Sequence, residues 1–275
     1  LLPLNLNMMT SVRDKLLTLY AAALDAVEGR NCVRNYLRNH DLAEAPVVLL
    51  AMGKAAAAMA AGACDVLGEH VIHGLVVTKE GHANIPLPAC LRVLEAAHPV
   101  PDERSLEAGQ AVIELVSQLS RDSQLLVLTS GGASALVEAL PKGIGLTDLA
   151  RLNRWLLGSG LSILEMNRIR QSISCLKGGK LAGFLKGQAA TNLLISDVPG
   201  DDPAFISSGP FYTATETEIE VTELPDWVVS MQQQAAAETS PTAPEQVVPH
   251  IIVASNQLAC EAALVCAQQN RRPAI

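Results

Sequence analysis

Residues 47–64, with the sequence VVLLAMGKAAAAMAAGAC, decide the fold of this chain. The apolar run at 47–52 predicts a short buried strand, and the alanine-rich stretch at 55–64 predicts a helix that packs closely behind it. A strand that is apolar at every position is typical of a parallel sheet covered by helices on both faces. This unit therefore predicts the first strand and helix of an α/β domain.

The same pattern recurs along the chain. Further apolar runs, each a predicted strand, lie at 72–78, 91–96, 124–129, 191–196 and 249–254. Helices are predicted at 10–27, at 105–120, within an insertion at about 147–185, and at 257–269. Alternating strands and helices predict a three-layer α/β/α fold with a doubly wound, mainly parallel, six-stranded Rossmann-like sheet of order 3-2-1-4-5-6. Ser162 and Glu165 form a predicted capping box. Residues 212–246 are expected to be a surface excursion with one helix near Trp227.

Composition excludes several classes of protein. The net charge of −8 and the 3% of aromatic residues argue against binding nucleic acid. The sequence contains no run of about 18 apolar residues, so no membrane span is predicted. The first residues lack the pattern of a signal peptide, and six scattered cysteines without a C-x-x-C pair suit a reducing compartment. We therefore expect a cytoplasmic protein. The sequence does not decide whether it forms a homodimer.

In a sheet of this order, ligands bind between the loops that follow the first and fourth strands. The first of these loops carries Gly53 and Lys54, directly before the alanine-rich helix. Backbone amides at the start of a helix, together with the Lys54 ammonium, predict a site for a phosphate or a carboxylate. The alternative is an exposed lysine that binds nothing.

The loop after the fourth strand reads Ser130-Gly131-Gly132-Ala133-Ser134. Paired glycines let the backbone approach a ligand and point successive N–H groups at an anion. We therefore predict that Ser130, Gly131, Gly132 and Ser134 bind substrate or phosphate. A tight turn without a ligand would also explain the glycines.

The loop after the fifth strand contains three carboxylates around Pro199-Gly200. Pro-Gly fits the centre of a type II turn, which would fold Asp201 back towards Asp197. Asp197, at the strand end, is a candidate general base, and Asp197, Asp201 and Asp202 are candidate Mg²⁺ ligands. Ordinary Asx turns are the alternative for Asp201 and Asp202.

A basic patch lies in the helical insertion. Arg170 and Lys177, with Asn167 nearby, could hold the carboxylate or phosphate of a substrate, although a solvated helix face is the alternative. His98 follows a strand, but a lone histidine is more often structural than catalytic.

Three common motifs are missing from the sequence. It has no G-x-x-x-x-G-K-[ST] and no G-x-G-x-x-G, which excludes a classical P-loop and leaves a standard dinucleotide fold without support. The serine-hydrolase pattern G-x-S-x-G fails because Leu136 stands where its second glycine belongs.

Several short motifs, in order between about residues 47 and 210, resemble those of the class II glycerate 2-kinases. They are Ala51-Met52-Gly53-Lys54-Ala55, His98-Pro99-Val100-Pro101-Asp102, Ser130 to Leu136, Asn167 with Arg170, Ser174 with Lys177-Gly178-Gly179, Asp197 to Pro203, and Ser207-Ser208-Gly209-Pro210. The resemblance implies ATP-dependent phosphorylation of D-glycerate to 2-phosphoglycerate with Mg²⁺. It also implies that Lys54 is an active-site lysine and that Asp197 belongs to the signature acidic loop.

The chain departs from this family in two respects. Phe211 follows Pro210, where the family usually continues with Thr, and the C-terminal MOFRL domain of the family is absent from these residues. Residues 1–275 are therefore expected to form the N-terminal α/β domain, with its active site in a cleft facing a second domain. Two other functions compete with the kinase: an NAD(P)H-dependent hydroxypyruvate reductase, disfavoured by the missing G-x-G-x-x-G, and a non-catalytic sensor of small anions.

Overall fold

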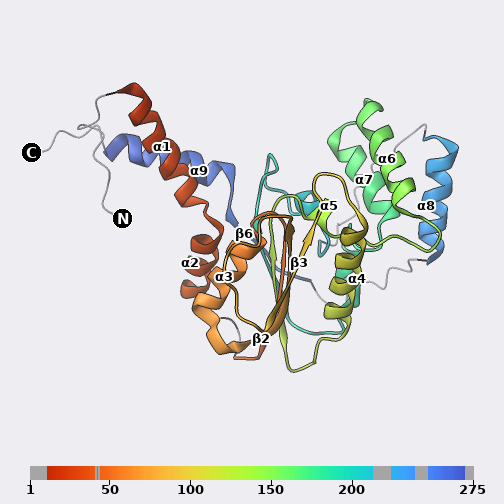
Figure 1. The fold of residues 1–275 in the computed structure, drawn as a ribbon, viewed down its shortest axis with the longest axis horizontal. Coiled ribbons are helices and arrows are strands. Elements are labelled where there is room, and N and C mark those ends of the chain that lie inside the picture. The colour runs from red at the N-terminus through yellow and green to blue at the C-terminus, as the bar shows by residue number, and fades with distance from the viewer. Residues whose placement is uncertain (1–10, 41, 43, 213–223, 239–246, 270–275) are drawn as a thin grey trace, which may run out of the picture.

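A six-stranded sheet of order β3-β2-β1-β4-β5-β6, in which every neighbouring pair is parallel, forms the centre of the molecule (Figure 1). The computed structural model describes residues 11–40, 42, 44–212, 224–238 and 247–269. The strands are β1 (Val47–Met52), β2 (Val71–Lys79), β3 (Leu91–Ala96), β4 (Gln124–Thr129), β5 (Ala190–Ile195) and β6 (His250–Ala254). The predicted doubly wound sheet and its strand order are confirmed.

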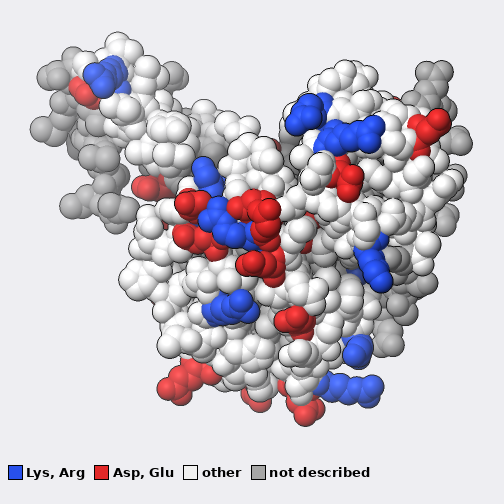
Figure 2. All heavy atoms as spheres, turned by 45° about the vertical axis from the view of Figure 1, so that its right-hand side comes forward, with Lys and Arg blue, Asp and Glu red and all other residues white. Residues whose placement is uncertain are grey.

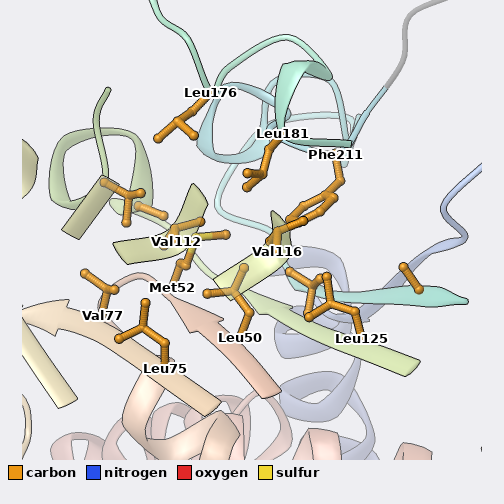
Figure 3. Close-up of a cluster of buried hydrophobic side chains, with 14 of the residues drawn as sticks. Leu50, Met52, Leu75, Val77, Val112, Val116, Leu125, Leu176, Leu181 and Phe211 are labelled. Atoms are coloured by element: carbon orange, nitrogen blue, oxygen red, sulfur yellow. The ribbon is translucent and has the colours of Figure 1, made fainter. Parts of the chain in front are cut away.

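Alternate residues of the central strands point to opposite faces, and each face has its own core. Leu50 and Met52 pack with α4 on one face (Figure 3), whereas Leu49 and Ala51 pack with α2 and α3 on the other. Because both faces are covered, β1 is buried along its whole length, as its continuous apolar sequence predicted.

The helices over the sheet include α3 and α4, which were predicted, and also α2 and the short α5, which sequence reasoning missed. They are α2 (Gly29–Asn39) and α3 (Ala56–Leu67) on one face, and α4 (Glu103–Ser117), the short α5 (Ala133–Leu136) and the 3-10 turn η3 (Lys180–Phe184) on the other. The side chain of Glu28 caps α2 by accepting hydrogen bonds from the amides of Arg30 and Asn31. The 3-10 turns η2 (Gly68–His70) and η4 (Ile206–Ser208) complete this part.

A helical unit stands beside the sheet (Figure 1) and consists of α6 (Leu146–Gly158), α7 (Ile163–Ile173) and α8 (Asp226–Glu238). The capping box of Ser162 and Glu165 at the start of α7 is confirmed. Two expectations are corrected. The insertion was expected to run to residue 185, but η3 packs into the core of the sheet. The helix near Trp227 exists, yet it is no surface excursion, because Val228 is buried against α6 and α7. Residues 213–223 and 239–246 of the predicted excursion lie outside the described residues.

Two helices near the ends of the described chain, α1 (Val12–Ala26) and α9 (Asn256–Gln269), pack on each other and project away from the sheet (Figure 1). Within the part of the chain that the structure describes, no helix has both the length and the apolar character needed to cross a bilayer.

Candidate functional site

Four loops meet at the carboxyl edge of the sheet, in the hollow between the α1/α9 pair and the helical unit (Figure 2). They follow β1, β3, β4 and β5, and they contain Lys54, His98, Gly131 with Gly132, and Asp197. Parallel strands end at the same edge of a sheet, so residues that lie far apart in the sequence become neighbours here.

The Lys54 side chain is exposed and reaches the loop after β4. A Cβ placed on Gly132 would lie 3.1 Å from Lys54 Cε, which makes these two residues direct neighbours. The backbone amide of Lys54 donates to the carbonyl of Gly131 at 3.0 Å, and that of Gly53 donates to Val77 at 3.0 Å. Both amides therefore already donate to backbone carbonyls, and the Lys54 ammonium is the group of this pair of residues that can bind an anion.

Gly53 and Ser130 hold the loops of the site against each other. Gly53 has a φ of 120°, and a Cβ there would lie 2.8 Å from the carbonyl carbon of Ser130, so only glycine lets the two loops touch. Ser130 is buried, and its hydroxyl accepts the amide of Ala55 at 3.0 Å while its carbonyl accepts the hydroxyl of Ser207 at 3.0 Å. Both residues therefore join the loops of the site to one another.

Gly131 and Gly132 contribute two backbone amides to this edge of the sheet. Among the described residues, no acceptor is found for their two amides. Gly132 adopts a left-handed φ of 90°, which turns the chain into the short helix α5. Unpaired amides beside a lysine ammonium form a compact set of donors for anionic oxygens.

Asp197 lies directly against Gly131. A Cβ on Gly131 would lie 2.6 Å from the carboxyl carbon of Asp197, so glycine at this position lets the Asp197 side chain pack directly on the loop after β4. The predicted type II turn is present, because the Asp201 amide donates to the Val198 carbonyl at 3.1 Å and Gly200 has a φ of 85°. The Asp197 carboxylate is exposed on the solvent side of this contact.

The three predicted metal ligands do not form one cluster. Across the described ranges, no group of three or more histidine, cysteine or acidic side chains is arranged to hold a metal ion. One oxygen of Asp202 accepts the amide of Ala204 at 2.9 Å, which is the Asx turn that was the alternative for this residue. A cation at this edge would therefore depend on one or two carboxylates and on oxygens from a ligand.

His98 belongs to the site, although sequence reasoning assigned it no catalytic part. A Cβ on Gly132 would lie 3.1 Å from His98 Nε2 as well as from Lys54 Cε. Partial burial and the positive charges of Lys54 and Lys79 lower the pKa of His98, and Asp197 opposes this effect. The imidazole is therefore held towards its neutral form. The signal in the sequence was the motif that begins at His98-Pro99.

A cavity of about 550 Å³ opens beside His98, between the loop after β3 and the helical unit. Ser134, Arg170 and Lys177 line it, which places three of the predicted binding residues together. The guanidinium Nε of Arg170 donates to the side-chain oxygen of Asn153 at 3.1 Å. Burial lowers the pKa of Arg170, and the charge of Glu138 opposes this. Asn167 is buried on α7 and does not line the cavity.

Lys177, which was predicted to bind substrate or phosphate, is paired inside the protein in this structure. Its ammonium forms an ion pair with Glu138, and the two side chains are only 4% and 3% exposed. The second carboxylate oxygen of Glu138 accepts the hydroxyl of Ser174 at 2.6 Å. Sequence reasoning missed Glu138, although an acidic residue inside the apolar stretch from Ala135 to Leu140 indicates a buried partner.

The fold and the site define an α/β protein of the doubly wound class, with an anion site at the carboxyl edge of its sheet. Comparison with known proteins is consistent with this class. The chain belongs to the family described as "Domain of unknown function (DUF4147)", whose model matches residues 15–239.

Two curated relatives and one crystal structure are among the proteins that are similar to the chain. A D-glycerate 2-kinase of Thermotoga maritima is 42% identical over 171 residues, which cover 62% of this chain and 41% of the relative. A protein of Agrobacterium vitis, whose name proposes a hydroxypyruvate reductase, is 43% identical over 173 residues, 63% of this chain and 44% of the relative. The crystal structure of a glycerate kinase from Thermotoga maritima superimposes with a TM-score of 0.82 at 32% identity, covering 96% of this chain and 64% of that structure. The chain thus spans less than half the length of these curated relatives.

Proposed function

We propose that this chain supplies part of the active site of an ATP-dependent kinase that phosphorylates D-glycerate to 2-phosphoglycerate. The observation that supports this most directly is the meeting of Lys54, the Gly131–Gly132 amides and Asp197 at one edge of the sheet. The Thermotoga relatives named as glycerate kinases support the choice of substrate.

Phosphoryl transfer depends mainly on positioning and on neutralising charge, and the site contains groups for both. The Lys54 ammonium and the unpaired amides of Gly131 and Gly132 would hold the anionic oxygens of the transferred group. Asp197 would accept the proton of the attacking hydroxyl, or orient that hydroxyl. The neutral His98 ring, beside Lys54, would donate or accept a hydrogen bond without adding charge.

The residues present fit a Mg²⁺–ATP complex in a limited way. Mg²⁺ in kinase sites is usually bound through one or two carboxylates, with phosphate oxygens and waters as the other ligands. Asp197 with Asp201 is the pair best suited to this, because one Asp202 oxygen is already bound to the amide of Ala204. When bound, the ion would neutralise charge on the phosphates.

A hydroxypyruvate reductase is the second candidate, and the name of the Agrobacterium vitis relative favours it. A reductase needs a nicotinamide site, and the sequence contains no G-x-G-x-x-G after a strand. The two functions separate in one experiment with the full-length protein. ADP release on D-glycerate supports the kinase, whereas NADH oxidation on hydroxypyruvate without ADP release supports the reductase.

Lys54→Met tests the assignment of the anion site. We expect this variant of the full-length protein to lose roughly 10²–10³-fold in kcat, the typical effect of removing a donor that stabilises developing charge. Lys186→Met is the matched control, because Lys186 is exposed and follows η3 near the opposite edge of the sheet. Near-normal turnover by Lys54→Met would exclude the proposed role of Lys54.

A further inference from the structure

The cavity beside His98 is larger than a three-carbon acid requires. Its volume of about 550 Å³ lies within the range of roughly 300–1,000 Å³ that is usual for pockets holding drug-sized ligands. Glycerate would fill a small part of it and leave most of the apolar wall in contact with water. The cavity therefore fits a larger ligand than the proposed acceptor.

Part of the wall of the cavity is apolar. Val100, from the loop after β3, is 62% exposed, and Leu157, from α6, is 78% exposed, and both side chains line this one cavity. Leu140 and Leu149 extend the same wall. Apolar side chains from two separate elements that face one cavity suit a flat ligand whose faces lose contact with water on binding.

A few polar groups on this wall are available to a ligand. The Asn153 side chain uses its oxygen to accept from Arg170, and among the described residues no acceptor is found for its NH₂ group. Arg154 also lines the cavity, with an exposed guanidinium. A guanidinium can stack on an aromatic ring, and a side-chain amide can hydrogen-bond to its edge. These are the contacts that a purine base would use.

The cavity borders the anion site. His98 and Ser134 line it, and His98 is also a neighbour of Gly132, beside Lys54. A ligand whose apolar end occupies the cavity could therefore place an anionic tail on Lys54 and on the amides of Gly131 and Gly132. A nucleoside triphosphate has this combination of a flat base and a charged tail.

We propose that this cavity binds the adenosine part of ATP, with the phosphates passing His98 and Ser134 to reach Lys54. This inference rests on the proposed kinase function and adds the location of the nucleotide within the chain. Asp197 then marks the far end of the phosphates, where the acceptor hydroxyl meets the transferred group. The alternative occupant of the cavity is the carboxylate of glycerate, held by Arg154 and Arg170.

Ligand-observed NMR titrations of the 275-residue chain with adenosine, ATP and D-glycerate test this assignment. Leu157→Ser removes part of the apolar wall at an exposed position and should leave the fold intact. Leu264→Ser is the matched control, because Leu264 is 57% exposed on α9 and does not line the cavity. We expect Leu157→Ser to weaken adenosine and ATP by about tenfold and to leave D-glycerate unchanged, while Leu264→Ser changes none of them.

Three results would overturn the proposal: no binding of adenosine, equal affinities for adenosine in Leu157→Ser and the unmodified chain, or a loss of affinity confined to D-glycerate. The last result would assign the cavity to the acceptor. Turnover of the full-length protein keeps the two ideas apart. An active kinase in which Leu157→Ser raises only the KM for glycerate refutes this site and retains the function. A protein without ADP release refutes the function, while the adenosine titrations still decide the site.

Discussion

Gly131→Ala is the sharpest perturbation of the site, because the new methyl group would collide with one functional side chain. The added Cβ would lie 2.6 Å from the carboxyl carbon of Asp197, whereas carbon atoms in contact are about 3.5–4.0 Å apart. Asp197 is exposed and its carboxylate can swing away, so the collision is relieved by moving the carboxylate roughly 1 Å. Gly131 does not have a positive φ, so alanine fits its backbone.

A displacement of about 1 Å in a catalytic group can cost roughly 10²-fold in rate. We therefore expect Gly131→Ala in the full-length protein to lower kcat for glycerate phosphorylation by about 10²-fold. The free energy of unfolding, measured in urea, should change by less than about 1 kcal/mol.

Gly158→Ala is the matched control for this experiment. Gly158 ends α6, and a Cβ there would meet no atom within 4 Å. This variant should keep full turnover. Full turnover by Gly131→Ala would refute the argument that the position of Asp197 against Gly131 matters for the reaction. A loss of turnover accompanied by unfolding would refute the argument that the collision is relieved by the side chain alone.

The remaining predictions concern the ion pair, the histidine and the helical unit. Glu138→Gln should lower the free energy of unfolding by about 3–5 kcal/mol, because it leaves the buried Lys177 charge without its partner. The double variant Glu138→Leu/Lys177→Met removes both charges and should lose less stability. Equal losses of stability in urea melts would contradict this. The pKa of His98 is lowered, which means that the folded protein resists protonation of this ring. The free energy of unfolding should therefore fall as the pH drops below the ordinary pKa of histidine, and it should fall less steeply in His98→Gln. Equal slopes of stability against pH in the two proteins would exclude the effect. In α6, Leu156→Ala should lower the free energy of unfolding by about 2–5 kcal/mol, because Leu156 is 1% exposed. Leu157→Ala should change it by less than about 0.5 kcal/mol. Similar shifts in the melting temperature of the two variants would mean that α6 is packed differently.

Local patterns in the sequence were enough to predict the sheet and the loops at its carboxyl edge. The run Val47–Met52 shows a strand covered on both faces, and the right-handed crossover rule then limits the order of the strands. Because parallel strands end at one edge, Lys54, Gly131 and Asp197 could be placed together before any coordinates were known. The type II turn around Gly200 and the capping box of Ser162 are also local, so they were predicted correctly.

Other features depend on partners that no local pattern specifies. A hydrogen bond joins atoms whose residues can lie anywhere in the sequence, so the sequence does not show which donors the fold has already used. The amide of Gly53 is bound by Val77, the hydroxyl of Ser130 accepts the amide of Ala55, and Lys177 is neutralised by Glu138.

The sequence by itself determined the α/β architecture and the edge at which the loops meet, because both follow from short-range periodicity and from the geometry of parallel strands. Only the tertiary structure decided which groups at that edge remain available to a ligand. It brought His98 beside Lys54, withdrew Lys177 into a buried pair and packed α8 onto α6 and α7. These outcomes depend on contacts between segments that lie far apart in the sequence, and such contacts form only in the folded chain.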